Sequence, residues 1–314
     1  MNDDLPTNLR PVADFFGLVG TPPVVKDFHV VRAIRTLAAL DAAPFRLVFA
    51  GGTALARAHK LIRRMSEDVD FKIVPLAPAP VSRNARQRGL SDLRERVTTA
   101  LHAAGFAFDP ADPVRIWRSQ NENRYTIWQL PYAYGEEIGE GLRPTIQVEL
   151  TYAELRLPAV TRPVSSFVAE AFGRAPEVDS IPCVSLTETA AEKLVSLTRR
   201  IAAERAGVSR DPDPTLVRHI YDLHALREHV DPVMMSRLAR EIALADAKEF
   251  ANQHPAYATD IAGETRKTLH AIQTDPAYRK QYDDFVAAMV YGEKWGFEGA
   301  ITTVASLSAD FLKH

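Results

Sequence analysis

Two aspartates one residue apart, Asp68 and Asp70, have the spacing that most clearly suggests chemistry. They lie in SEDVDFKIVP, residues 66–75, an apolar-rich run that predicts a strand ending at a proline. Because strand side chains alternate between faces, both carboxylates should leave one face while Val69 and Phe71 leave the other. Carboxylates about 7 Å apart repel each other, and a bound Mg²⁺ or Mn²⁺ ion would relieve the repulsion. The pair therefore suggests metal-assisted phosphoryl or nucleotidyl transfer.

A glycine pair precedes the aspartates by about one helical element. Gly51 and Gly52 end the apolar run at 45–50, and glycines let a backbone approach a phosphate closely. The helix expected next would offer free N–H groups, with Thr53 as its cap or as a phosphate contact. Ser66 could bind phosphate or cap the strand entry. The plainer alternative is an ordinary turn followed by a solvated acidic strand.

These residues sit in a predicted sheet domain. Hydrophobic periodicity and turn residues predict helices at 23–40, 53–64 and 84–104 and strands at 45–50, 66–75, 114–118, 124–130 and 145–152. This order indicates an α+β (α/β) fold, a mixed sheet flanked by helices. We therefore expect one domain over residues 1–165.

From about residue 185 the sequence becomes helix after helix, so we expect an all-helical domain over 185–314. The predicted helices span 187–206, 213–228, 231–249, 257–274, 277–290 and 296–312. Loops are expected at 75–83, 136–144 and 207–214, and the domain boundary near 160–186, where prolines accumulate.

Composition sets broad limits on function. The 314 residues carry a formal net charge of −2, and this net charge does not indicate nucleic-acid binding. Arginines nevertheless cluster at 63–64, 83–96 and 115–124. A single cysteine, Cys183, rules out an internal disulfide and favours a cytoplasmic setting. The sequence contains no predicted signal peptide or membrane span.

The stretch from Val24 to Phe71, which contains the glycine pair and both aspartates, closely resembles the AbiEii-type nucleotidyltransferases, including MenT-type toxins. These enzymes belong to the DNA polymerase β-like nucleotidyltransferase superfamily. The resemblance implies a nucleotidyltransferase sheet domain and a helical domain that completes the active-site cleft.

Three later stretches extend the resemblance. TIQVEL, at 145–150, would supply Glu149 as the third metal-binding acid, unless it is merely a solvent-facing residue of an edge strand. LTETAAEKLVSLTRR, at 186–200, would supply Lys193 to the nucleotide phosphates, with Arg200 supporting it.

The last stretch, TLVRHIYDLHAL at 215–226, supplies Asp222 as an active-site acid and Arg218 as the family's arginine. Many relatives have an aspartate directly after that arginine, whereas this chain has His219. A metal site formed by His219, Asp222 and His224 is an alternative.

The resemblance implies a Mg²⁺- or Mn²⁺-dependent nucleotidyltransferase (EC 2.7.7 type) that acts as the toxin of a toxin–antitoxin, phage-defence type pair. It would transfer NMP from an NTP to an RNA, with the tRNA 3′ end favoured, and a nearby gene would encode its antitoxin. A protein or small-molecule hydroxyl acceptor, or a non-catalytic nucleotide-binding role, are the alternatives. The NTP used, the acceptor, the antitoxin and the oligomeric state are not encoded in these patterns.

Other residues carry weaker expectations. Arg63, Arg64 and the arginines at 83–96 could guide an RNA backbone. Lys26 and Asp27 are expected in an intrahelical or interdomain salt bridge. The aromatic residues of the strand region are expected mostly in the core, although one could stack on a base: Trp117, Tyr125, Trp128 and Tyr132.

Overall fold

The protein is described here by a computed structural model that covers residues 5–76, 82–118, 124–134, 138, 141–208, 213–249, 251 and 254–313. The chain forms two compact units, Met1–Val184 and Ser185–His314. Each of the loops expected at 75–83, 136–144 and 207–214 falls partly outside the described residues.

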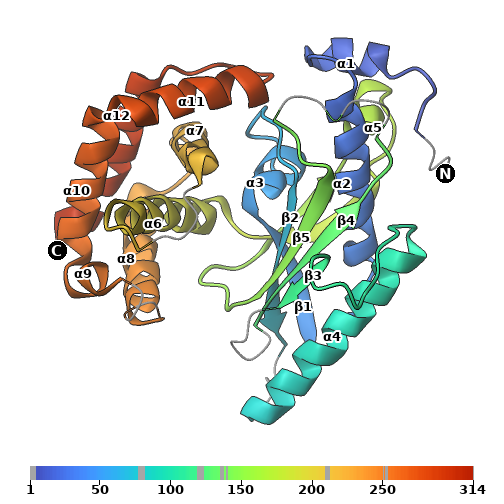
Figure 1. The fold of residues 1–314 in the computed structure, drawn as a ribbon, viewed down its shortest axis with the longest axis horizontal. Helices are drawn as coiled ribbons and strands as arrows, with labels where there is room; N and C mark the ends of the chain where they lie inside the picture. The colour runs from blue at the N-terminus through green and yellow to red at the C-terminus, as the bar shows by residue number, and fades with distance from the viewer. Residues whose placement is uncertain are drawn as a thin grey trace. The chain divides into compact units, whose positions relative to one another are not determined.

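The first unit is built on a seven-stranded mixed sheet in the order β3-β4-β5-β2-β1-β7-β6 (Figure 1). Its strands β2 and β5 are parallel, as are β1 and β7, and the other neighbouring pairs are antiparallel. The strands are β1 Phe45–Ala50, β2 Asp68–Pro75, β3 Ile116–Arg118, β4 Tyr125–Pro131, β5 Thr145–Tyr152, β6 Val160–Val164 and β7 Val178–Cys183.

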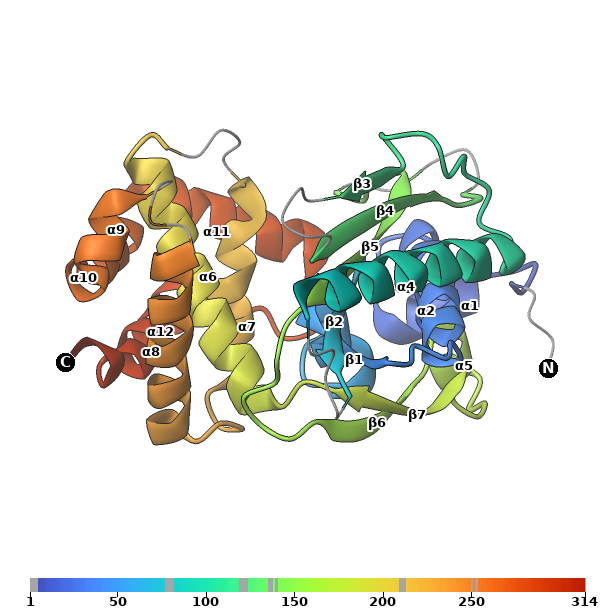
Figure 2. The same cartoon turned by 90° about the horizontal axis from the view of Figure 1, so that it is seen from below.

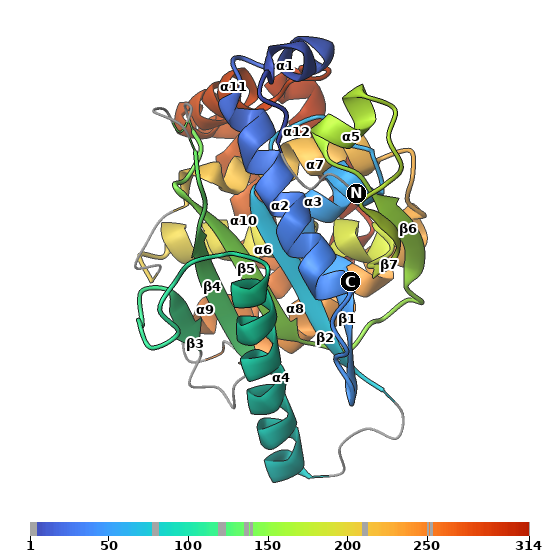
Figure 3. The same cartoon turned by 90° about the vertical axis from the view of Figure 1, so that its right-hand side faces the viewer.

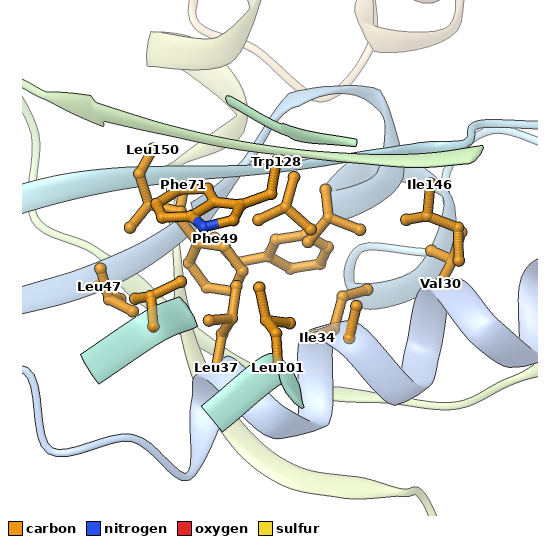
Figure 4. Close-up of a cluster of buried hydrophobic side chains, with 14 of the residues drawn as sticks. Val30, Ile34, Leu37, Leu47, Phe49, Phe71, Leu101, Trp128, Ile146 and Leu150 are labelled. Carbon is orange, nitrogen blue, oxygen red and sulfur yellow. The ribbon is translucent and has the colours of Figure 1, made fainter. Parts of the chain in front are cut away.

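Helices α2 and α4 cover one face of this sheet (Figure 3). The helices of the unit are α1 Arg10–Phe16, α2 Pro22–Ala38, α3 Gly51–Thr53, which continues as a π-turn over Ala54–Ala58, α4 Arg83–Ala103 and α5 Phe167–Ala171. Figure 4 shows the core between the helices and the sheet, where Leu37 and Leu101 meet Phe49, Phe71 and Trp128. Side chains on alternate strand positions fill this core, so the intervening positions project from the opposite face.

The second unit consists of helices in the part of it that the structure describes. Its central helix, α6 Leu186–Arg205, packs against α7, α8 and α10 (Figures 1 and 2). Ser185 caps α6 by accepting a hydrogen bond from the Glu188 N–H. The remaining helices are α7 Arg218–Leu226, α8 Pro232–Glu249, α9 Pro255–Thr259, α10 Ile261–Thr274, α11 Pro276–Met289 and α12 Phe297–Ser308, with 3₁₀ turns at Pro214–Val217 and Phe311–Lys313.

The α+β class, with a mixed sheet, flanking helices and C-terminal helices, is confirmed. The helix predicted over 53–64 is wrong beyond Ala58. There His59 turns toward the carbonyl of Val184, at 3.1 Å, and Lys60 adopts a left-handed φ of 56°. These tertiary contacts override a favourable helix composition.

Two strands lie where no secondary structure was predicted. Strands β6 and β7 fall within the expected boundary region of 160–186, and each contains a proline, Pro163 or Pro182. Proline is tolerated in edge strands, and β6 forms one edge of the sheet. No helix in the described part of the chain is long and apolar enough to cross a lipid bilayer.

Candidate functional site

Three carboxylates share the face of the sheet opposite α2 and α4, which we call the acidic face. Asp70 on β2 lies directly opposite Glu149 on the parallel strand β5, and Asp68 lies opposite Gln147. The intervening residues, Val69 and Phe71 among them, are buried in the core. Strand alternation therefore brings together the three acids that sequence reasoning named as metal ligands.

Hydrogen-bond donors hold two of these carboxylates. Tyr125 on β4 donates its hydroxyl to Glu149 Oε2 at 2.7 Å, and the amide of Gln147 donates to Glu149 Oε1. Burial, followed by the negative charge of Glu149, raises the pKa of Tyr125, so the phenol remains a donor at any physiological pH. On Asp68, Oδ1 accepts a hydrogen bond from Arg143. Glu149 and Asp68 are thus fixed in orientation before any ligand binds.

Arg143 is anchored by a buried ionic network. Its Nε lies 2.9 Å from Glu67 Oε1, and Glu67 Oε2 in turn lies 2.9 Å from Lys26 Nζ. Lys26 is fully buried and also donates to the carbonyls of Arg143, at 2.8 Å, and Thr145, at 2.6 Å. Burial lowers the pKa of Lys26, and the charge of Glu67 partly restores it.

The expectation that Lys26 and Asp27 form an intrahelical or interdomain salt bridge is wrong in where the partners lie. Lys26 pairs with Glu67, and Asp27 pairs with Arg57 at 2.8 Å and accepts from the Phe167 N–H at 2.6 Å. Both contacts lie within the first unit but outside helix α2. They connect this helix to Glu67, directly before the strand that carries the aspartates, and to the turn that follows the glycine pair.

The glycine pair is packed directly against the acids. Gly51 has a φ of +74°, and a Cβ added to it would lie 1.8 Å from Asp70 Oδ2. A Cβ on Gly52 would lie 2.5 Å from the guanidinium of Arg64 and 2.9 Å from Ser66 Oγ. Only glycine permits this approach. The turn thus packs Gly51 against Asp70 and Gly52 against Ser66 and Arg64.

Thr53 does not cap the following helix as expected. Its buried hydroxyl lies 2.9 Å from Ser66 Oγ and also bonds to the carbonyl of Asp68, so it ties the glycine turn to β2. Helix α3 is only three residues long before the π-turn. The glycine turn itself, rather than the start of a long helix, provides the close approach to the acids.

The arginines expected to guide RNA differ in where they lie. Arg64 is buried and donates to the carbonyl of Met65 at 2.8 Å, whereas Arg63 is exposed. Arginines 83–96 belong to α4, which covers the opposite face of the sheet. One of them, Arg96, donates to the carbonyl of Ala43 at 2.9 Å. The α4 arginines therefore do not line the acidic face.

In the second unit, Lys193 on α6 and Asp222 on α7 form a buried ion pair of 2.7 Å. Arg200, two turns after Lys193, pairs with Asp213 at 3.0 Å and helps to lower the pKa of that carboxyl against the opposing effect of burial. Burial, followed by the charge of Lys193, lowers the pKa of His219 well below its usual value, so this histidine is neutral.

Oxygen donors in this arrangement suit Mg²⁺ or Mn²⁺ chemically. Within the described residues, however, no group of three or more His, Cys, Asp or Glu side chains is arranged to hold one metal ion. Neither the three acids of the sheet nor the alternative set of His219, Asp222 and His224 forms such a group among the described residues. Because Arg143 bonds to Asp68, and Tyr125 and Gln147 bond to Glu149, a shared ion requires these carboxylates to exchange partners.

Sequence reasoning missed the residues that support the acids. Gln147 could have been found, since it precedes Glu149 by two positions on the same predicted strand. Tyr125 could have been placed on the same face only with the β4–β5 register, and Arg143 and Lys26 carry no local pattern that marks them as partners of Glu67.

Comparison with known proteins places this chain in a family. The profile of the family described as Nucleotidyl transferase AbiEii toxin, Type IV TA system, matches residues 35–302. The fold is similar to that of MenT4, a nucleotidyltransferase toxin from Mycobacterium tuberculosis H37Rv, with a TM-score of 0.56 and 17% sequence identity over 98% of this chain and 91% of that one. No curated protein sequence matches the chain.

Proposed function

The chain belongs to the AbiEii nucleotidyl transferase toxin family of type IV toxin–antitoxin systems, and from this premise we propose that it transfers a nucleoside monophosphate from an NTP to an RNA hydroxyl. It is a nucleotidyltransferase, and its family implies an NTP substrate and an antitoxin partner. The favoured acceptor is the 3′ end of tRNA, carried over from the resemblance to MenT-type toxins.

One observation supports the chemistry above all others. Asp70 and Glu149 are register partners on parallel strands, Asp68 shares their face, and the glycine turn lies against Asp70. Once they exchange their present partners, these carboxylates would be able to hold Mg²⁺ or Mn²⁺, which would neutralise charge on the phosphates during the transfer. The acceptor hydroxyl would attack the α-phosphorus, and the bond to pyrophosphate would break.

The remaining residues take supporting roles in this proposal. Gly51 and Gly52 would let the triphosphate approach the backbone, with Ser66 beside them as a hydrogen-bond donor. Lys193 would act on the phosphates as a point charge, oriented by Asp222. Arg200 would add to the positive charge on the same helix.

The test is transfer of label from α-labelled NTPs to total tRNA or to a cell lysate in the presence of Mg²⁺. Separation of the products into RNA, protein and small molecules identifies the acceptor class. We expect labelled RNA with the wild type and none with Asp70→Ala. Asp179→Asn is the matched control, because Asp179 is an exposed acid on β7.

Equal labelling by the wild type and Asp70→Ala would contradict the assigned role of the acidic face. Label found only in protein or in small molecules would retain the transfer but move the acceptor away from RNA.

A further inference from the structure

One row of residues runs straight across five strands of the acidic face. Register pairs link Ala50 to Asp70, Asp70 to Glu149, Glu149 to Ile127, and Ile127 to Trp117. Paired residues on neighbouring strands project from the same face. At about 4.8 Å per strand, the backbone of Trp117 lies about 14 Å from that of Asp70.

The orientation of Trp117 is fixed by its neighbours on β3. Ile116 is buried in the core, so Trp117 projects from the acidic face. The contrast with Trp128 is direct. Trp128 is fully buried and donates its indole N–H to Thr98 on α4, whereas Trp117 is 49% exposed.

Tyr125 links this tryptophan to the acids. The rings of Trp117 and Tyr125 lie 5.5 Å apart in a T-shaped contact, and the hydroxyl of the same Tyr125 donates to Glu149 at 2.7 Å. The tyrosine therefore buttresses the indole on one side and the carboxylate on the other. The T-shaped geometry leaves part of the indole surface uncovered.

We propose that Trp117, together with its apolar neighbour Ile127, forms a stacking site for a nucleobase of a substrate. Along the row the surface changes from aromatic and apolar at Trp117 and Ile127 to acidic at Glu149 and Asp70. A nucleotide likewise has an apolar end and a charged end, since its base is flat and apolar on its faces and its phosphates require cations. The base would lie on Trp117, and the sugar–phosphate would run toward the carboxylates.

This site deepens the proposed nucleotidyl transfer and rests on it for the identity of the ligand. The base belongs either to the NTP or to the end of the RNA acceptor, and stacking alone favours neither, because every base presents a π face. The two sources are therefore separate arms of the test.

Binding is measured on the full chain in the presence of Mg²⁺, with NTP analogues whose α,β-bridge is a methylene group, so that no turnover occurs. The probes are these analogues of the four NTPs, a short single-stranded RNA with a 3′-hydroxyl, and the same RNA with an abasic 3′-terminal nucleotide. Quenching of tryptophan fluorescence reports stacking in the wild type, and anisotropy of labelled RNA together with equilibrium dialysis of labelled NTPs reports affinity in all variants.

The variants separate ring stacking from simple apolar contact. Trp117→Leu keeps apolar area without a π face, and Trp117→Phe keeps a ring. Val114→Ala, an exposed apolar position just before β3, is the control. We expect Trp117→Leu to bind at least one base-bearing probe roughly 5- to 150-fold more weakly than the wild type, Trp117→Phe to recover most of the affinity, and Val114→Ala to match the wild type.

If the RNA supplies the base, the abasic RNA should bind the wild type and Trp117→Leu equally. Unchanged affinity of Trp117→Leu for every probe would overturn the proposal. It would also be overturned if Trp117→Leu lost the same affinity for the abasic RNA as for the intact RNA and its affinity for NTPs did not change. Failure of the transfer proposal is read separately, from Asp70→Ala in the labelling assay, because these binding measurements require no chemistry.

Discussion

The close packing of Gly51 against Asp70 yields a prediction for Gly51→Ala. The new Cβ would lie 1.8 Å from Asp70 Oδ2, whereas real Cβ atoms do not approach closer than 3.0 Å, so the carboxylate must move by about 1 Å or more. A misplacement of that size at a reacting centre can lower a rate by about 100-fold. We therefore expect a loss of nucleotidyl transfer of about this size.

The substitution also affects stability, and the chain provides a matched control. A left-handed φ costs an alanine about 1–2 kcal/mol, and Gly17 has a φ of +68° with nothing within 4 Å of an added Cβ. Gly17→Ala should therefore show only the backbone cost, with normal transfer. Gly51→Ala should lose more free energy of unfolding than Gly17→Ala, because the displaced Asp70 adds to it.

Urea unfolding and the labelling assay measure the two effects. In an Asp70→Ala background, the stability cost of Gly51→Ala should approach that of Gly17→Ala, since the clashing carboxylate is gone. If Gly51→Ala instead matches Gly17→Ala in stability and the wild type in transfer, the close approach to Asp70 has no consequence and the reasoning is refuted.

Three further predictions concern buried ionisable groups. Lys193→Met and Asp222→Leu should each lower the free energy of unfolding by about 3–5 kcal/mol, because each leaves a buried charge unpaired. In urea unfolding, the double variant should lose less than the sum of the two single losses. Additive losses would show that the two residues are not coupled. Burial raises the pKa of Asp27 to about 6 despite its ion pair with Arg57. The folded state therefore binds the proton more tightly, and unfolding free energy should fall by about 3 kcal/mol as pH rises from about 4 to about 6, a component that Asp27→Asn should lack when both are titrated. Burial raises the pKa of the Cys183 thiol to about 12. A thiol reagent at pH 8 should therefore modify Cys183 only after unfolding. Rapid labelling of the folded chain would contradict the burial of this thiol.

Local pattern was enough to place the carboxylates on one face. The alternation of Asp68, Val69, Asp70 and Phe71 predicts two faces, and the structure has the apolar pair in the core and the acids opposite. The same rule places Glu149 on its strand. These predictions need only a strand, because the period of two is a property of the backbone.

Predictions that depended on distant partners were less successful. Arg57 lies in the stretch predicted as a helix over 53–64, yet it is buried because the carboxylate of Asp27, on a different helix, pairs with it. The row from Asp70 to Trp117 likewise depends on the order and register of strands that are distant in sequence. Pairing across a sheet is set by tertiary packing, which single-residue patterns do not encode.

The ionic network beneath the acidic face has a consequence for where this protein can be shortened. The family profile matches from residue 35, yet Lys26 and Asp27 lie before that point, on the first turns of α2. A chain trimmed to the matched region would leave Glu67 and Arg57 without these buried partners and would remove support from Arg143, which bonds to Asp68. The segment upstream of residue 35 thus belongs to the same structural unit as the catalytic candidates.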